Sequence, residues 1–307
     1  MKTYKFSGHE SFPCRYSWLP KAFRTISKHP DVFADDERAM VEMGVGKNMV
    51  RAIRFWALAA DIAESGQKGK YSVTDFGRTI LEEGGFDSYL EDIRTLWLLH
   101  WKLSTQIDEP LFAWDFLLNR WQHPEISRTE VLRAFRQETK QLDRPISDVT
   151  LDQHFDTFLH TYIPTRGRKG DVQEDSLDCP LVEIELIQEI GERRIDNSGK
   201  REPIYAFRRE PKLEITAELF IYCLDDFWKR RRANEKTLTF RDLSIAHGSP
   251  GQVFKLPEWD IRERLERLEV ESDGAFRYQE SSSLQQVIRK GLSDRKFLTA
   301  IYTSTVD

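Results

Sequence analysis

The stretch that most constrains the fold is residues 43–63, M-G-V-G-K-N-M-V-R-A-I-R-F-W-A-L-A-A-D-I-A. Apolar residues recur in it at helical spacing, which is typical of a helix with one buried side. These residues are Val45, Met49, Ala52, Ile53, Trp56, Ala60 and Ala63. Lys47, Arg51 and Arg54 fall on the opposite side, and the helix has no Asp or Glu before Asp61. The pattern predicts a helix that is buried on one side and cationic on the other.

Such a helix suits a polyanion that binds along its cationic side. Gly44 and Gly46 let the backbone turn tightly before the helix, and the first turn of a helix offers free N–H groups to phosphate. We interpret this stretch as the recognition helix of a winged helix-turn-helix, while a core helix with a solvated basic side explains the same pattern. A Walker A nucleotide loop does not fit, because Val41 and Asn48 replace its first glycine and its hydroxyl.

Composition sets broad limits on the rest of the chain. Its 307 residues suggest about two domains. The net charge of -5 means that any nucleic-acid contact comes from local patches. Cys14, Cys179 and Cys223 are far apart and form neither a zinc motif nor a disulfide scaffold. Since there is no apolar signal segment and no run of about 18 apolar residues, we expect a cytoplasmic protein without a membrane span.

The order of the patterns predicts a mainly α fold with a minor α+β part. Residues 1–86 are expected to form a winged-helix DNA-binding domain. It contains helices at 15–26 and 34–43, the basic helix, a Gly/Lys tip at 65–70 and a β-like segment at 71–74. Residues 87–163 form a helical middle domain, and residues 164–307 form a C-terminal α+β domain that is winged-helix-like with β-hairpins.

Within the later parts of the chain, apolar spacing and turn signals predict individual elements. Ser127-x-x-Glu130 has the form of a capping box. The middle helices are expected at 89–104, 112–122, 127–141 and 150–162, followed by a polar break at 164–179. Strands at 181–190 and 204–209 are expected to pair, with helices at 215–229 and 259–268 after them. Asp273-Gly274 predicts the turn of a hairpin at 270–278.

The segment Gly8-His9-Glu10-Ser11 carries the side chains best suited to chemistry. An imidazole that moves a proton and a carboxylate that binds a divalent ion would form a phosphodiester site. The alternative interpretation is structural: Glu10 or Ser11 caps the following helix, and His9 makes a hydrogen bond in the core.

Other titratable residues favour structural roles. His100 lies in the apolar run 96–101 and is interpreted as a core histidine, and the tryptophans 56, 97, 101, 114 and 121 are interpreted as core residues. Asp152, Asp156 and His160 share one side of a helix. A metal site is possible there on spacing alone, but a solvated acidic surface is the favoured interpretation.

Four blocks of the sequence together resemble a known bacterial family. They are F-S-G-H-E-S-F-P-C-R-Y-S-W-L at 6–19, G-V-G-K-N-M-V-R-A-I-R-F-W at 44–56, T-D-F-G-R-T-I-L at 74–81 and G-S-P-G-Q-V-F-K-L at 248–256. The family is a domain of unknown function from DNA phosphorothioation operons, the SspB-like family. Its genes lie beside those for a cysteine desulfurase, sulfur-transfer proteins and an ATPase. The resemblance implies a DNA-binding protein that nicks one strand, so that sulfur can replace a non-bridging phosphate oxygen.

We therefore expect a DNA-binding component of an antiphage phosphorothioation system that acts as a metal-dependent, single-strand nicking endonuclease. His9 and Glu10 are the catalytic candidates, and Mg²⁺ or Mn²⁺ is the expected cofactor. The expected partners are double-stranded DNA and the sulfur-transfer and ATPase proteins of the same operon. The expected DNA-binding residues are Lys47, Asn48, Arg51, Arg54, Arg15 and Lys70.

Two alternatives stay open. The sequence has no P-D-x(n)-E-x-K, H-N-H or G-I-Y-Y-I-G arrangement. That favours a non-catalytic adaptor, which reads DNA and recruits the sulfur-transfer machinery. A transcriptional regulator is the weaker alternative, because it requires a dimer surface that the sequence does not indicate.

Overall fold

The computed structural model describes residues 3–164, 179–195, 199–281, 284–290 and 297–303. Contacts within the chain define two compact units. Unit 1 comprises Met1–Trp114 and Gln122–Arg208, and unit 2 comprises Asp115–Trp121 and Arg209–Asp307. Among the described residues, none of the helices has the length and apolar character needed to cross a membrane.

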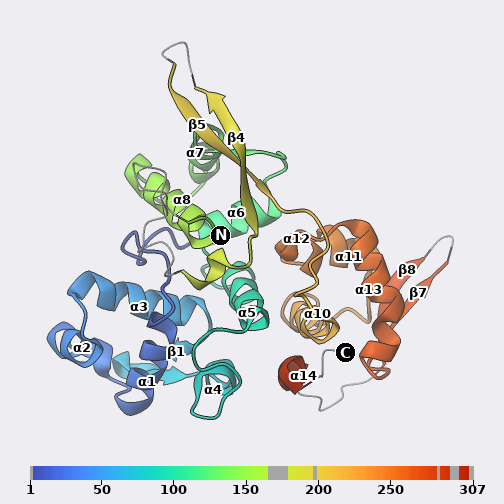
Figure 1. The fold of residues 1–307 in the computed structure, drawn as a ribbon, viewed down its shortest axis with the longest axis horizontal. Helices are drawn as coiled ribbons and strands as arrows, with labels where there is room; N and C mark the ends of the chain where they lie inside the picture. Colours follow the sequence, from blue (N-terminus) through green and yellow to red (C-terminus); the bar gives the residue numbers. More distant parts are fainter. Residues whose placement is uncertain (1–2, 165–178, 196–198, 282–283, 291–296, 304–307) are drawn as a thin grey trace. The chain divides into compact units, whose positions relative to one another are not determined.

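Unit 1 begins with three helices and a small hairpin, in the order that the sequence predicts (Figure 1). Asp35 begins the second helix by accepting hydrogen bonds from the backbone N–H groups of Glu37 and Arg38. Gly44 ends that helix in the left-handed region, with φ of 62°. The elements are α1 Trp18–Lys28, η1 Val32–Ala34, α2 Asp36–Met43, α3 Lys47–Ala59, β1 Ala63–Ser65, η2 Gln67–Gly69, β2 Tyr71–Val73 and α4 Asp75–Leu81.

The first helix starts later than its apolar pattern predicts. Residues before Trp18 form a turn, and α1 then runs past Pro20 without a break. Backbone N–H groups in the first turn of a helix have no acceptor within the helix. Proline, which lacks this N–H group, is therefore tolerated there. The helix therefore continues through Pro20.

The helical middle of the chain follows its predicted ranges closely. Ser127 caps the third of these helices by accepting a hydrogen bond from the Glu130 N–H group, as the capping pattern predicts. The predicted tryptophan core is confirmed, since Trp97, Trp101 and Trp114 are almost completely buried. The helices are α5 Ile93–Ser104, α6 Phe112–Asn119, α7 Arg128–Thr139 and α8 Asp148–Tyr162.

The predicted strand pair of unit 1 is confirmed, with shifted limits. It consists of β4 Ile187–Arg194 and β5 Arg201–Phe207, which pair antiparallel. The first strand begins late because Pro180–Val182 forms the 3₁₀ turn η3. A third strand, β3 Ile126–Ser127, joins β5 and was not predicted. Most of the predicted polar break, residues 165–178, lies outside the described residues.

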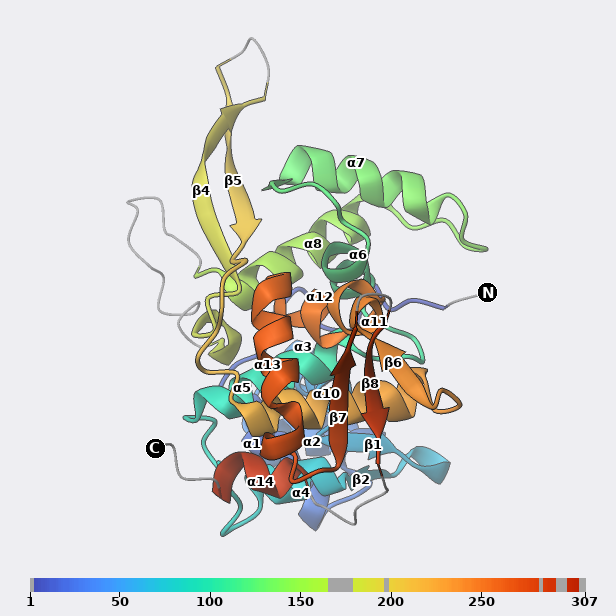
Figure 2. The same ribbon diagram turned by 90° about the vertical axis from the view of Figure 1, so that its right-hand side faces the viewer.

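Unit 2 combines helices with an antiparallel sheet in the order β6–β8–β7 (Figure 2). Its helices bury an apolar core that includes Leu224, Leu243 and Leu265. The elements are α10 Ala217–Arg231, β6 Thr237–Thr239, α11 Phe240–Ile245, α12 Pro250–Phe254, α13 Glu258–Glu271, β7 Phe276–Glu280, β8 Gln285–Arg289 and α14 Phe297–Thr303.

The sequence predicted that the hairpin of unit 2 turns at Asp273-Gly274. This prediction is wrong. These residues have φ of 45° and 78°, and the Gly274 N–H group donates to the Glu269 carbonyl. They end α13 with left-handed residues, a common way to end a helix. The hairpin lies further along the chain, between β7 and β8.

The sequence block at 248–256, together with His247 before it, holds the end of α6 within unit 2. His247 Nε2 lies 2.8 Å from a carboxylate oxygen of Asp115. The Gly248 N–H group donates to Asn119 Oδ1 at 2.7 Å, and the buried Lys255 ammonium donates to the Leu118 carbonyl. This block therefore has a clear structural role.

The predicted fold class is confirmed at the coarse level: the chain is mainly helical with small antiparallel sheets. The order of three helices followed by a hairpin occurs in both units, with β6 ahead of the helices in unit 2. The winged-helix identification itself stays a prediction, as does the division into domains at 1–86, 87–163 and 164–307.

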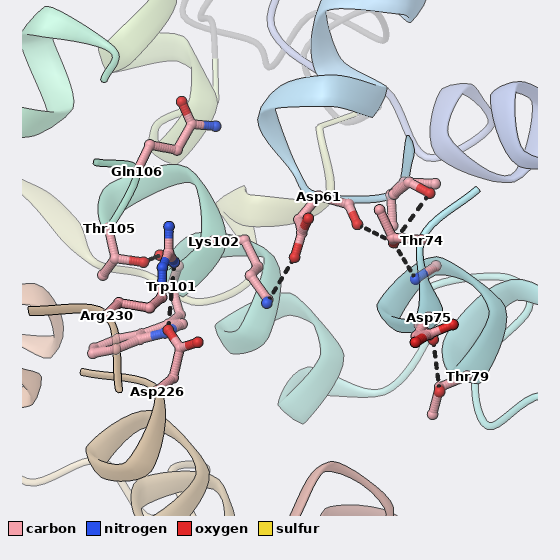
Figure 3. Close-up of polar contacts among 12 residues, drawn as sticks. Asp61, Thr74, Asp75, Thr79, Trp101, Lys102, Thr105, Gln106, Asp226 and Arg230 are labelled. Atoms are coloured by element: carbon pink, nitrogen blue, oxygen red, sulfur yellow. Dashed lines mark hydrogen bonds and ion pairs between the residues drawn. The ribbon is translucent and has the colours of Figure 1, made fainter. Parts of the chain in front are cut away.

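The turn between α3 and β1 is held in place by side-chain hydrogen bonds (Figure 3). Thr74 begins α4 by accepting from the Gly77 N–H group, while its own hydroxyl donates to the Asp61 carbonyl. The Asp61 carboxylate in turn accepts a hydrogen bond from the Lys102 ammonium at 2.8 Å. The turn after α3 is thereby tied to both α4 and α5.

Gly77 allows α4 to approach this turn closely. A Cβ atom at residue 77 would lie 2.4 Å from the Ile62 carbonyl oxygen, which is backbone and cannot move aside easily. We expect Gly77→Ala to lower the free energy of unfolding by about 1–3 kcal/mol, despite alanine's better helix propensity. Urea denaturation measures the change.

The matched control is Gly46→Ser, which adds a side chain where no atom lies within 4 Å. Serine is a good residue at the start of a helix, so this variant should be as stable as wild type or slightly more stable. Equal stability of the Gly77→Ala variant and wild type would show that this contact is not tight.

Candidate functional site

The cationic side of α3 is accessible where the sequence predicts it. Lys47 and Asn48 are exposed in the first turn, and Arg51 and Arg54 are half-buried further along. Gly46 precedes the helix, and no side chain caps it. The first backbone N–H groups of a helix have no partner within the helix. Four of the six predicted DNA-binding residues thus lie on one helix beside a potential anion-binding terminus.

An acid from the preceding helix lies against this cationic side. The Asp36 carboxylate pairs with the Lys47 ammonium at 2.8 Å. The hydrogen bond from Lys47, together with the charges of Lys47, Arg51 and Arg54, holds the pKa of Asp36 below its usual range. The sequence of α3 contains no acid, but the fold supplies one from α2. Any anion that binds at the start of α3 must therefore compete with Asp36 for Lys47.

The remaining predicted DNA-binding residues lie on other elements. The Arg15 guanidinium carbon is 5.5 Å from the centre of the Trp18 ring, in the turn before α1. Lys70 is exposed in the connection between β1 and β2, directly before β2. The six residues thus come from three separate parts of unit 1.

Residues 6–12, here called the N-terminal hook, form a tight turn. The Phe12 N–H group donates to the His9 carbonyl at 2.8 Å and closes the turn. Glu10 and Ser11 have φ of 50° and 61°, a left-handed conformation that costs a non-glycine residue roughly 1–2 kcal/mol. Ser11 is exposed and Glu10 half-buried, whereas only 3% of His9 is exposed. The surrounding structure must therefore hold this turn in place.

The hook packs directly on α3, beside its cationic side. A Cβ atom at Gly8 would lie 2.9 Å from the Phe55 ring, and Gly8 has φ of 106°, so this residue needs to be glycine on both counts. The Trp56 indole N–H group donates to the Phe12 carbonyl at 3.0 Å. Phe55 follows Arg51 by one helical turn, and residues at this spacing are neighbours on a helix surface. The hook and the Arg51 side of α3 are therefore adjacent.

On its other side, the hook is held by a histidine of α8. His9 Nε2 lies 3.1 Å from His154 Nδ1, and the Ala113 N–H group donates to His154 Nε2 at 3.0 Å. Neutral His154 therefore carries its proton on Nδ1. His9 Nδ1 accepts a hydrogen bond from the Ser11 N–H group at 3.1 Å and lies 3.2 Å from the Thr157 hydroxyl oxygen. The two imidazoles thus link the hook to α8 and, through the Ala113 N–H group, to α6.

The pair leaves no position for an additional proton. A doubly protonated ring would set His9 Nδ1 against the Ser11 N–H group or His154 Nε2 against the Ala113 N–H group, as well as burying a charge. Burial lowers the pKa of His9 to about 4, with a hydrogen bond to the Phe6 backbone opposing the shift. Burial and the neighbouring His9 hold the pKa of His154 well below its usual range. Both rings are therefore neutral near neutral pH.

The structure decides between some of the structural alternatives for the candidate residues. Neither Glu10 nor Ser11 caps α1, which begins at Trp18 after Ser17. That part of the alternative is wrong, whereas the expected core hydrogen bonds of His9 are present. The core role of His100 is also confirmed, since it is buried with Nδ1 2.8 Å from the Tyr162 hydroxyl.

The donor set for a metal ion is sparse. Within the part of the chain that the structure describes, no group of three His, Cys, Asp or Glu side chains is placed to hold a metal ion. The acidic side of α8 is occupied instead by Arg128, which pairs with Asp152 and Asp156. A preformed protein cage for Mg²⁺ is thus not found among these residues.

Sequence reasoning missed His154 and Thr157 as partners of His9. Both lie on α8, about 145 residues further along the chain. The available signal was a histidine between Leu151 and Phe158 on the buried side of that helix. This signal indicates a satisfied core histidine without identifying its partner.

Residues 6–302 match the family described as Protein of unknown function (DUF4007). The chain belongs to this family. The match spans all four sequence blocks, so the resemblance drawn from them is confirmed. No curated protein matches the sequence.

Two solved structures share the fold of this DUF4007 protein. A magnesium ion-bound crystal structure of SspB is 24% identical, with a TM-score of 0.79, and the match covers 94% of this chain and 83% of that one. A second SspB crystal structure is 23% identical, with a TM-score of 0.79, covering 94% of this chain and 84% of that one. At this level of identity, the likeness establishes the fold.

The neutral imidazole pair should make the protein sensitive to acid. Folding lowers the pKa of His9 from 6.5 to about 4. The free energy of unfolding of the protein therefore falls as the pH drops from about 6.5 to about 4. The shift corresponds to roughly 3 kcal/mol for His9 once the pH is below about 4, and His154 acts in the same direction. Urea unfolding at a series of pH values measures this loss.

The variant His9→Gln keeps a hydrogen-bonding side chain but cannot ionise. We expect its free energy of unfolding to depend less steeply on pH between about 6.5 and 4 than that of wild type. His123→Gln, which changes an exposed histidine, is the matched control and should follow wild type. Equal slopes for wild type and His9→Gln would show that His9 is not the acid-sensitive group.

Proposed function

We propose that this DUF4007 protein is a double-stranded DNA-binding component of a DNA phosphorothioation system. The observation that carries the proposal is α3, with three cations, no acid of its own and an uncapped N-terminus facing solvent. Phosphate contacts supply most of the affinity in such complexes, and base contacts supply specificity. Lys47 and Arg51 would contact phosphate or guanine edges, Asn48 an adenine edge, and Arg54, Arg15 and Lys70 the backbone.

The system-level part of the proposal is supported by the family and by its structural neighbours. Both neighbours are SspB proteins. By this reasoning, the protein works in the cytoplasm in antiphage defence, with the sulfur-transfer and ATPase proteins of the same operon as partners. The winged-helix interpretation belongs to the same proposal, with α3 as the recognition helix and the β1–β2 hairpin as the wing.

We further propose that the hook takes part in nicking one DNA strand. Glu10 is at the surface of a strained turn that is adjacent to the Arg51 side of α3. A bound Mg²⁺ or Mn²⁺ would polarise a phosphate oxygen and neutralise charge there. Such ions are commonly held by one or two carboxylates together with water and substrate phosphates, and Glu10 would supply the carboxylate here. One neighbouring structure is described as magnesium ion-bound, which supports this choice of ion.

In the nicking reaction, water adds to phosphorus and one P–O bond of the backbone breaks. His9 is neutral and faces His154, so its part is to position the turn rather than to supply a proton to DNA. Arg51 would bind the phosphate through its guanidinium.

The adaptor alternative rests on a specific observation. Among the described residues, no three candidate metal ligands converge, and the sequence lacks the common nuclease motifs. In that case α3 binds DNA while a partner protein cuts it.

DNA binding is tested by changing the charges at the start of α3. Lys47→Ala combined with Arg51→Ala should weaken binding and reduce the slope of log K against log salt by about 1.8, or about 0.9 for each lost phosphate contact. Asp36→Asn should strengthen binding, because it releases Lys47 from its ion pair. Fluorescence anisotropy with a labelled duplex at several salt concentrations measures both effects.

Asp75→Asn is the matched control, because it removes an exposed acid from α4 that lies near Arg78 rather than near α3. It should change binding less than Asp36→Asn does. Unchanged affinity and salt slope for the Lys47/Arg51 double variant would place the DNA on another surface.

Nicking is tested with supercoiled plasmid and purified protein, with Mg²⁺, Mn²⁺ or a chelator. We expect metal-dependent open circles, a large loss of nicking in Glu10→Gln, and partial recovery in Glu10→Asp, which retains the carboxylate. His9→Gln should need more metal for half-maximal nicking while melting normally at neutral pH. A plasmid that is bound but stays closed with wild-type protein would establish the adaptor alternative.

A further inference from the structure

Helix α13 has the opposite charge to α3, although the two occupy similar places in their units. Each follows two shorter helical elements and precedes a hairpin. α3 has three basic and no acidic residues. α13, E-W-D-I-R-E-R-L-E-R-L-E-V-E, has six acidic and three basic residues. A helix with this excess of acid repels phosphate, so α13 is not a second DNA-reading helix.

A groove beside α13 exposes large apolar side chains. Its volume is about 410 Å³, and its lining includes Leu213 and Trp259. Leu213 is 92% exposed and Trp259 is 59% exposed. The other seven tryptophans of the chain are buried, at 7% exposure or less. An exposed tryptophan beside a groove is a typical anchor point in protein–protein interfaces.

The charged residues on this side of α13 leave an acidic excess. The two arginines of the groove are already paired: Arg264 with Asp260 at 2.8 Å, and Arg267 with Glu263. Arg264 also donates to the carbonyls of Ile215 and Lys212. Glu271 lies at the end of the groove, where burial raises its pKa, Arg267 and Arg264 oppose that rise, and Glu218 adds to it.

Side chains that line the groove form a row along one side of α13. Trp259, Glu263, Arg267 and Glu271 follow at i, i+4, i+8 and i+12, a spacing that places them in one row. At 1.5 Å per residue this row is about 18 Å long, enough for three turns of a bound helix or a short extended peptide.

We propose that the α13 groove docks a basic protein segment that inserts an apolar side chain beside Trp259 and Leu213. The apolar side chains would supply affinity, and the acidic excess would select a lysine- or arginine-bearing partner. A second copy of this chain is a poor occupant, because a two-fold interface sets the same surface against itself and would oppose acid to acid. This inference concerns unit 2 and does not depend on DNA binding by α3.

The single exposed tryptophan gives a direct readout, because acrylamide reaches Trp259 before the buried indoles. The probe is a 14-residue amphipathic peptide with leucines on one side and lysines on the other. The control peptide, its glutamate twin, has glutamate in place of each lysine. Both peptides are added to the full-length protein. We expect the lysine peptide to lower the quenching constant about twofold by covering Trp259. The glutamate twin and a DNA duplex should leave it unchanged.

Variants separate charge from apolar contact. Glu218→Gln with Glu271→Gln should weaken binding of the fluorescently labelled lysine peptide about tenfold at low salt. Trp259→Ala should also weaken it. Glu235→Gln, an exposed acid elsewhere in unit 2, is the control and should match wild type.

Four results would overturn the proposal. They are no protection by the lysine peptide, equal protection by the glutamate twin, protection by duplex DNA, and protection that rises with protein concentration alone. The third would make this groove a nucleic-acid surface, and the fourth would make it a self-association surface.

Discussion

The hydrogen bond between His9 and His154 joins parts of unit 1 that are 145 residues apart. It fixes the hook on α8, and the Trp56 indole fixes the same hook on α3. The turn at Glu10 and Ser11 is strained, so it persists only because these contacts hold it from both sides. The pair accepts no further proton without setting donor against donor. The geometry of the candidate site therefore depends on two imidazoles that remain neutral.

Charge is distributed unevenly over the two units, and this distribution separates their proposed roles. The overall charge is -5, yet α3 carries three cations with no acid among them. Asp36 offsets part of that charge through its ion pair with Lys47. A polyanion can outcompete this single ion pair because it makes several contacts at once. In unit 2 the corresponding helix is acidic and lies beside apolar side chains. One surface thus suits a nucleic acid, and the other suits a basic protein.

Features set by local sequence were predictable. The basic side of α3, the Ser127 cap and the buried His100 all follow from spacing within one helix. Features set by contacts between distant residues were not. Asp36 reaches Lys47 only because α2 folds back beside α3, and nothing near His9 indicates His154. The Asp273-Gly274 pair was misread because the same left-handed residues that close a hairpin also end a helix. The two-residue strand β3 has no periodicity to detect.

The central claim is that the start of α3 and the hook form one DNA-binding surface. Hydrogen–deuterium exchange of the full-length protein, with and without a saturating DNA duplex, tests it most directly. The account predicts slower exchange on DNA binding for peptides that cover residues 9–12 and the first turns of α3, with no change across α13. Slower exchange confined to α13 or to the β4–β5 hairpin, with residues 9–12 and 47–54 unaffected, would contradict it.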